Sequence, residues 1–323
     1  MLSGFDLARA IGDLGFIIGT SLMYATPLIY TSLGGTVSEN SGVVNIGLEG
    51  MMAIGAFVAA AVGYFTGNPW LGFLAGGAAG GLMALLHAIA SVTLAADQII
   101  SGVAINFLGP GLALFLSRVF FENATTTKAL DLKNKIERPL NGLFTQGSFL
   151  DSVFNQYTTV YLAFFLVFVI WFMLYKTRFG LRLRACGEHP KAADTLGINV
   201  YRIRYIAVIM SGILAGFGGA SLSIAVVSRF SPALISGQGF IALAAMIFGK
   251  WKPQGAMGAS LFFGAATGLS IYIGSLENVN VSSHLLQMIP YILTLVVLMG
   301  FIGKATAPSA DGEAYIKDGE GRV

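Results

Sequence analysis

The sequence predicts an all-α fold: a polytopic transmembrane helix bundle of about eight to ten spans, with broken or re-entrant segments. Apolar residues make up 55% of the 323 residues, and charged residues only 11%. A soluble domain usually carries about 25% charged residues. Several apolar runs are long enough to cross roughly 30 Å of hydrocarbon. We therefore expect residues 1–304 to form one transmembrane domain.

The spans are predicted from apolar runs between polar breaks. In chain order, these runs lie at 15–33, 42–64, 70–94, 98–120, 158–175, 203–227, 238–249, 255–275 and 286–303. The run at 238–249 is too short to cross a bilayer alone, so we expect a broken or tilted helix there. Glycines four residues apart, Gly76 with Gly80 and Gly212 with Gly216, predict close helix crossings.

The charged loops predict the orientation. Seven of the nineteen Lys and Arg residues lie in the loop 176–204, whereas the loop 122–157 carries four basic and four acidic residues. Because cytoplasmic loops are enriched in Lys and Arg, we expect 176–204 inside and 122–157 outside. Lys250, Lys252 and Lys304 then also fall on the cytoplasmic side.

The two chain ends are predicted differently. Nine full crossings place Met1 outside, whereas re-entry of residues 34–50 would place it inside. Residues 305–323 are rich in Gly, Asp and Glu, which predicts a disordered cytoplasmic tail.

One polar segment lies at the start of the second span. Glu49 stands between Gly47 and Gly50, shortly after Asn45. Such a segment can unwind at membrane depth, where irregular backbone is tolerated only inside protein or along a cavity. Broken helices of this kind form substrate sites in transporters. In one interpretation Asn45 and Glu49 line the substrate path. In the other, Glu49 caps a neighbouring helix or pairs with a basic residue.

A second polar group lies on the fourth span. Gln98, Ser101 and Asn106 are spaced to share roughly one helical face. That face offers hydrogen-bond donors and acceptors to a polar solute. Asp97 precedes the span and suits the role of its N-cap.

A third polar group precedes the short run. Gly237 and Gly239 flank Gln238, and Phe240 follows. A half-helix that begins here with its N-terminus pointing inward would bind an anionic or polar group. A simple outer turn is the alternative. Gln238 and Phe240 complete the candidate substrate path.

Several kinds of functional site are missing from the sequence. It contains no phosphate loop, no metal-ligand spacing, no nucleophile elbow and no membrane-embedded chain of Asp, Glu and His. We therefore expect no catalytic residue, metal or cofactor on this chain. Its transport energy should come from a partner.

The basic loop contains a helical pattern. Pro190 suits a first helical turn, Ala192 and Ala193 favour helix, and Gly197 suits the stop. A helix of about two turns needs a surface to pack on. The pattern predicts docking of a soluble partner, and the alternative is a solvated loop that only sets topology. The candidate coupling residues are Arg182, Arg184, Glu188, Pro190, Ala192, Ala193, Asp194, Leu196 and Gly197.

These segments resemble a known family of permeases. Residues 191–197 resemble the Glu-Ala-Ala-x-x-x-Gly loop by which permeases of ABC importers contact their ATPase, with a departure at Lys191. The permeases of nucleoside and simple-sugar importers carry similar segments along nearly the whole chain. Those segments are 38–39 with 42–52, 97–102 with Asn106, 184–188 with 196–200, and 237–245 with 251–253.

The resemblance implies a heteromeric importer in a bacterial plasma membrane. Its other parts would be a second, homologous permease, an ATPase with two nucleotide-binding halves that holds ATP and Mg²⁺, and a lipoprotein that binds the solute. The chain is most similar to the shorter permease of nucleoside importers, which implies purine or general nucleoside transport. The alternatives are ribose or another simple sugar in the same machine, a stand-alone secondary carrier, and a structural membrane protein.

Overall fold

The computed structural model describes residues 7–131, 135–276, 282–300 and 306–317, and the regular elements within these ranges are helical. The long helices are α1 (Leu7–Glu39), α2 (Leu48–Thr66), α3 (Pro69–Ala88), α4 (Gln98–Phe120), α6 (Thr158–Lys176), α9 (Val200–Ala220), α11 (Pro253–Ser275) and α12 (Ser283–Gly300). The shorter ones are α5 (Phe149–Phe154), α7 (Arg178–Glu188), α8 (Pro190–Thr195) and α10 (Gln238–Phe248). Two π-helical turns, η1 (Ile89–Thr93) and η3 (Ser221–Val226), extend α3 and α9.

Seven helices of the described chain are long and apolar enough to cross a membrane. They correspond to the predicted spans other than 238–249 and 286–303, so the predicted all-α polytopic bundle is confirmed. The run at 238–249 forms the short helix α10, as expected. The last predicted span corresponds to α12, and its final residues, 301–303, lie outside the described chain.

The boundary between the first two spans differs from the prediction. The first helix continues to Glu39, and the second begins only at Leu48. Thr31 and Thr36 donate hydrogen bonds to carbonyls four residues earlier in α1. These hydroxyls are satisfied inside the helix, so the polar end of α1 is compatible with helix at membrane depth, where the sequence predicts a break.

Close crossings organise the centre of the bundle. A Cβ atom on Gly80 would lie 2.2 Å from the carbonyl oxygen of Gly212, and one on Gly216 would lie 2.4 Å from that of Gly76. The predicted glycine faces of α3 and α9 therefore pack backbone against backbone, as small residues allow in lipid. On the other side, α1 packs against α9, α10 and α11.

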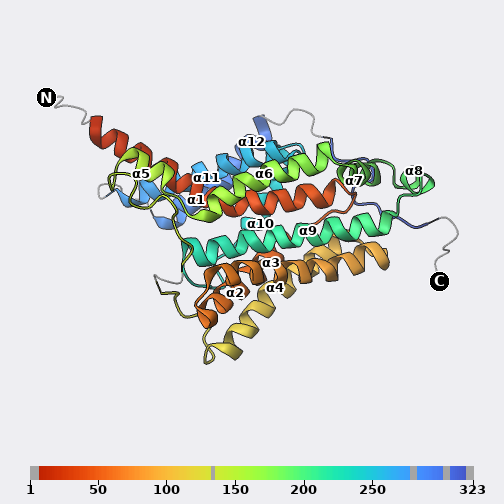
Figure 1. The fold of residues 1–323 in the computed structure, drawn as a ribbon, viewed down its shortest axis with the longest axis horizontal. Helices are drawn as coiled ribbons and strands as arrows, with labels where there is room; N and C mark the ends of the chain where they lie inside the picture. The colour runs from red at the N-terminus through yellow and green to blue at the C-terminus, as the bar shows by residue number, and fades with distance from the viewer. Residues whose placement is uncertain (1–6, 132–134, 277–281, 301–305, 318–323) are drawn as a thin grey trace.

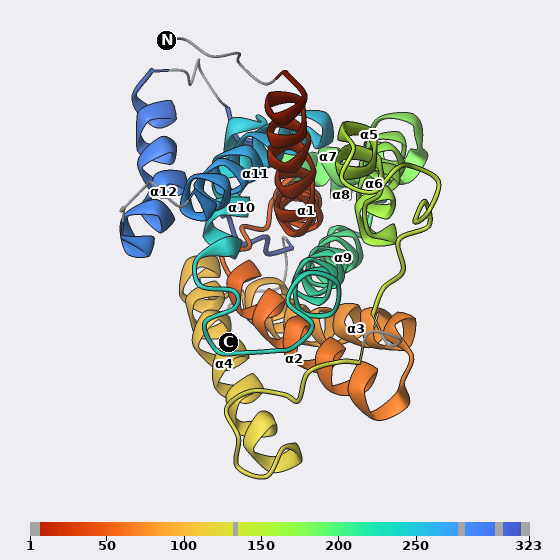
Figure 2. The ribbon, with the colours of Figure 1, turned by 90° about the vertical axis from the view of Figure 1, so that its left-hand side faces the viewer.

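The bundle has two distinct ends and one open flank. Figure 1 shows α5 at one end and α7 and α8 at the other, which we call the α5 end and the α8 end. Figure 2 shows α4 and α12 on one flank, with α10 between them. The outer face of α4 is apolar and open, with Ile100 70% and Phe107 78% exposed.

The tail departs from the predicted disorder. Residues 306–317 lie against the α8 end of the bundle, whereas 305 and 318–323 lie outside the described chain. The backbone N–H of Ala310 donates to the carbonyl of Gly187 at 2.8 Å, and Arg204 Nη1 donates to the carbonyl of Glu313 at 2.8 Å. Arg204 itself is 1% exposed and also donates to the carbonyl of Ser41. A buried arginine thus joins the tail to the segment after α1.

Docking of the tail is expected to depend on pH through Asp311. Burial raises the pKa of this carboxyl to about 7, against the opposing effects of Arg204 and of a hydrogen bond with Glu39. Because the docked state favours the neutral carboxyl, docking should weaken as pH rises from about 4 to about 7, and then level off. A spin label on exposed Ala314 should therefore be more mobile at pH 8 than at pH 5. The Asp311→Asn variant should show a smaller difference in label mobility between the two pH values. A wild-type label insensitive to pH would contradict this account.

Candidate translocation and coupling sites

The segment between α1 and α2 is non-helical, and α4 satisfies its backbone. Gln98 Oε1 accepts a hydrogen bond from the backbone N–H of Val44 at 2.7 Å. Asn106 accepts from the N–H of Gly50 at 2.9 Å and donates to the carbonyl of Ile46 at 2.9 Å. We call residues 40–47 the broken segment. Two side chains of α4 therefore replace the hydrogen bonds that a continuous helix would make.

A histidine adds a third link. His87 of α3 lies with Nε2 3.0 Å from the carbonyl oxygen of Val44 and Nδ1 2.9 Å from Ser101 Oγ. Gln98, Ser101 and Asn106 therefore share one face of α4, as predicted. Gln98 and Asn106 bind the backbone at the broken segment directly, and Ser101 does so through His87. Whether the same face also contacts a passing solute stays a prediction. Asp97 caps α4, as expected, by accepting from the N–H groups of Ile99 and Ile100.

Asn45 lies at the centre of the broken segment and is fully buried. Its Nδ2 donates to Ser211 Oγ of α9 at 2.9 Å, while its Oδ1 has no hydrogen-bond partner in the described chain. The spacing of residues in the sequence gave no sign of Ser211, because one serine in an apolar helix forms no pattern.

The carboxylate of Glu49 caps α10. It accepts from the backbone N–H groups of Gly237 and Gly239, each at 2.6 Å. Gly237 has a φ of +83° and offers no side chain as a cap, so the cap comes from α2. Two of the predicted polar groups therefore meet, and Glu49 occupies the half-helix N-terminus that the sequence offered to an anion.

Asn106 is expected to stabilise the broken segment. Replacing it with alanine leaves the N–H of Gly50 and the carbonyl of Ile46 without their partner, at a cost of about 1–3 kcal/mol for each group that stays dry. The thermal midpoint of the purified complex should therefore fall. Gln254→Ala, which removes an exposed amide from α11, is the matched control and should leave the midpoint unchanged. Equal midpoints for both variants would contradict the role given to Asn106.

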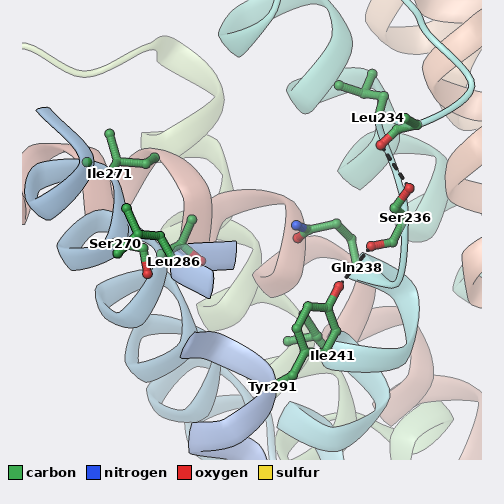
Figure 3. Close-up of a pocket in the computed structure, with 11 residues that line it drawn as sticks. Leu234, Ser236, Gln238, Ile241, Ser270, Ile271, Leu286 and Tyr291 are labelled. Atoms are coloured by element: carbon green, nitrogen blue, oxygen red, sulfur yellow. Dashed lines mark hydrogen bonds between the residues drawn. The ribbon is translucent and has the colours of Figure 1, made fainter. Parts of the chain in front are cut away.

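A cavity of about 490 Å³ lies beside the start of α10, between α10, α11 and α12. Gln238 lines it, and Figure 3 shows its side chain pointing from α10 toward α11. Phe240 is 50% exposed and is not among the lining residues. Asn45, Glu49 and the three predicted α4 residues also lie outside the lining. The structure therefore separates the predicted path residues into a backbone network, the cavity residue Gln238 and the exposed Phe240.

The basic loop folds into α7 and α8. Helix α8 begins with Pro190, as predicted, and ends at Thr195, just before the predicted stop at Gly197. Gly197 follows with a φ of +80°, where a side chain would be strained. On α7, the guanidinium of Arg184 lies 4.8 Å from the ring centroid of Tyr175.

The predicted coupling residues differ in exposure. Ala193 is buried, which anchors α8 to the bundle, whereas Leu196 is 81% exposed. Arg182, Glu188 and Ala192 are also exposed at this end. Asp194 instead forms an ion pair with Lys317 of the tail at 3.7 Å. Helix α8 and the exposed Leu196 that follows it thus present a small surface at this end.

Comparison with known proteins identifies a family. Residues 17–298 match the family described as branched-chain amino acid transport system / permease component. The chain is 50% identical to the guanosine ABC transporter permease protein NupQ of Bacillus subtilis, with 94% of this chain and 97% of NupQ covered. It is 45% identical to the nucleoside ABC transporter permease protein NupC of Lactococcus lactis, with 96% and 99% covered.

A third relative is named for a different solute. The chain is 34% identical to the putative glucose ABC transporter permease protein TsgC13 of Haloferax volcanii, with 87% of this chain and 90% of TsgC13 covered. No solved structure matches the chain.

Proposed function

Since the chain belongs to the family of branched-chain amino acid transport system permease components, we propose that it is the permease subunit of an ATP-driven nucleoside importer. The observation that carries the proposal is 50% identity, over nearly the full length of both chains, to a guanosine permease. A second nucleoside permease at 45% identity supports the same cargo. The proposed substrates are purine nucleosides or nucleosides in general.

The proposed partners follow from the same assignment. They are an ATPase with two nucleotide-binding halves, a homologous permease and a lipoprotein that delivers the solute. On the flank with α4 and α12, Ile100 and Phe107 are widely exposed, which suits contact with lipid as well as with a second permease. ATP and Mg²⁺ would bind the ATPase, and this chain would bind neither.

The proposed orientation places the α8 end in the cytoplasm of a bacterial cell and the α5 end outside. The excess of Lys and Arg in the loop 176–204 supports this placement. Helix α8, with Leu196 exposed beside it, then faces the ATPase. The first residues, 1–6, lie outside the described chain, and the outer location of Met1 stays a prediction.

A simple sugar is the alternative cargo, and its support is the 34% identity to the glucose permease. Uptake by a strain that lacks only this gene separates the two cargoes. We expect uptake of labelled guanosine and uridine to fall and ribose uptake to stay unchanged. Restoring the gene should restore the uptake. Unchanged nucleoside uptake with reduced ribose uptake would overturn the nucleoside proposal.

A further inference from the structure

The cavity between α10, α11 and α12 has the features of a small-molecule site. Its volume of about 490 Å³ falls in the range of roughly 300–1,000 Å³ that is typical of ligand pockets. Ile241, Ile271 and Leu286 form apolar wall, and a few polar side chains converge among them. Figure 3 shows these residues around one space, with Gln238 and Tyr291 projecting from α10 and α12.

Gln238 is the polar group that lacks a partner. Its side chain is half-buried, and its amide makes no hydrogen bond within the described chain. The amide carries a donor and an acceptor side by side. Such a group in a cavity suits a ligand that presents an acceptor next to a donor.

The serine and threonine hydroxyls of the cavity offer only acceptors to a ligand. Ser236, Thr267 and Ser270 each donate to a backbone carbonyl, at 3.0, 3.1 and 2.8 Å. Their hydrogens are therefore engaged, and their oxygens are left as acceptors. A ligand that fits them must bring hydroxyl donors of its own.

Tyr291 supplies an aromatic wall. Its hydroxyl donates to the carbonyl of Ser236 at 3.1 Å, which holds the ring at the cavity, and the side chain remains 47% exposed. Nucleobases stack on aromatic rings of this kind, and the contact is tolerant of which base is present.

We propose that this cavity binds the transported nucleoside, with the base on Gln238 and Tyr291 and the ribose hydroxyls on Ser236, Thr267 and Ser270. The inference rests on the proposed function, which supplies the nucleoside. The Watson–Crick edges of guanine, uracil, adenine and cytosine all present a donor next to an acceptor, and an amide matches each of them by turning over. The site therefore takes both purine and pyrimidine nucleosides.

The position of the site links the cargo to the start of α2. Gln238 stands between Gly237 and Gly239, whose N–H groups are held by Glu49 at the start of α2. A ligand on Gln238 thus contacts the tip of the half-helix that Glu49 fixes to the first turn of α2.

The test measures the ratio of guanosine to uridine taken up from a mixture by the assembled importer in proteoliposomes. The same solute-binding protein delivers both nucleosides to every variant, so its own preference cancels. Gln238→Glu offers two acceptors, which suit the adjacent N1–H and N2–H₂ donors of guanine. Uracil has one donor between two carbonyls. We expect the ratio to rise about tenfold, the scale of one bidentate pair.

Matched variants control for general damage. Gln254→Glu makes the same change in the first turn of α11, away from the cavity, and should leave the ratio unchanged. Tyr291→Phe keeps the ring and should transport better than Tyr291→Ala, whose uptake of both nucleosides should fall about tenfold with the lost stacking.

The outcomes separate the site from the function. Nucleoside uptake by the wild type, together with an unchanged ratio in Gln238→Glu, would overturn the site and leave the importer standing. Equal losses in Tyr291→Phe and Tyr291→Ala would overturn the stacking role. A wild-type importer that takes up no nucleoside would instead overturn the proposed function.

Discussion

Replacing Glu49 with alanine is expected to abolish most nucleoside uptake and to lower the thermal stability of the complex. The N–H groups of Gly237 and Gly239 lose the carboxylate that binds both at 2.6 Å. A buried donor without a partner costs about 1–3 kcal/mol, and bonds to a carboxylate are stronger than neutral ones. The start of α10 should then detach from α2. Uptake and thermal midpoint, measured on the same preparation, report the two effects.

Two further variants sharpen the Glu49 experiment. Glu49→Gln keeps one acceptor oxygen and should fall between the wild type and alanine. Glu137→Ala removes an exposed acid from the 122–157 loop and should leave both readouts unchanged. Uptake by Glu49→Ala within twofold of the wild type would mean that transport does not need the Glu49 cap.

Disrupting the end of α8 is expected to uncouple ATP hydrolysis from transport. Gly197 has a φ of +80° and open space around it, so Gly197→Val acts on the backbone alone. A β-branched residue is strained there by about 1–3 kcal/mol. The complex should keep its basal ATPase activity, lose stimulation of that activity by loaded binding protein, and lose nucleoside uptake.

The 122–157 loop offers a matched control for the α8 experiment. Gly142 also has a positive φ, +85°, and open space, and Leu143 beside it is 69% exposed. Gly142→Val and Leu143→Asp should transport normally, whereas Gly197→Val and Leu196→Asp should not. Leu196→Asp leaves the backbone unstrained, so it separates docking from local distortion. Normal uptake by both α8 variants would mean that α8 does not carry the coupling.

The sequence predicts the helices and the polar groups well, because both leave local patterns. Apolar runs mark the spans, and glycines around Glu49 mark the break. The i, i+3 and further spacings of Gln98, Ser101 and Asn106 mark their shared face. Each of these signals lies within one segment of chain.

The connections between these segments are harder to predict. The cap on α10 joins Glu49 to backbone N–H groups 188 and 190 residues away, and backbone groups carry no side-chain signal. The structure of residues 306–317 differs from the predicted disorder for a similar reason. Its composition predicts disorder, yet carbonyls of the tail and of the α1–α2 turn bind buried Arg204. Long-range hydrogen bonds to the backbone therefore determine how these segments are held together, and local composition does not reveal them.

The proposed function requires that this chain move nucleosides in a machine driven by ATP. It is tested most directly with the assembled importer in proteoliposomes, by following labelled guanosine with ATP on the ATPase side. We predict accumulation only when ATP is present, with strong competition by unlabelled guanosine and uridine and none by excess ribose. Accumulation that needs no ATP, or that ribose blocks while uridine does not, would contradict the claim.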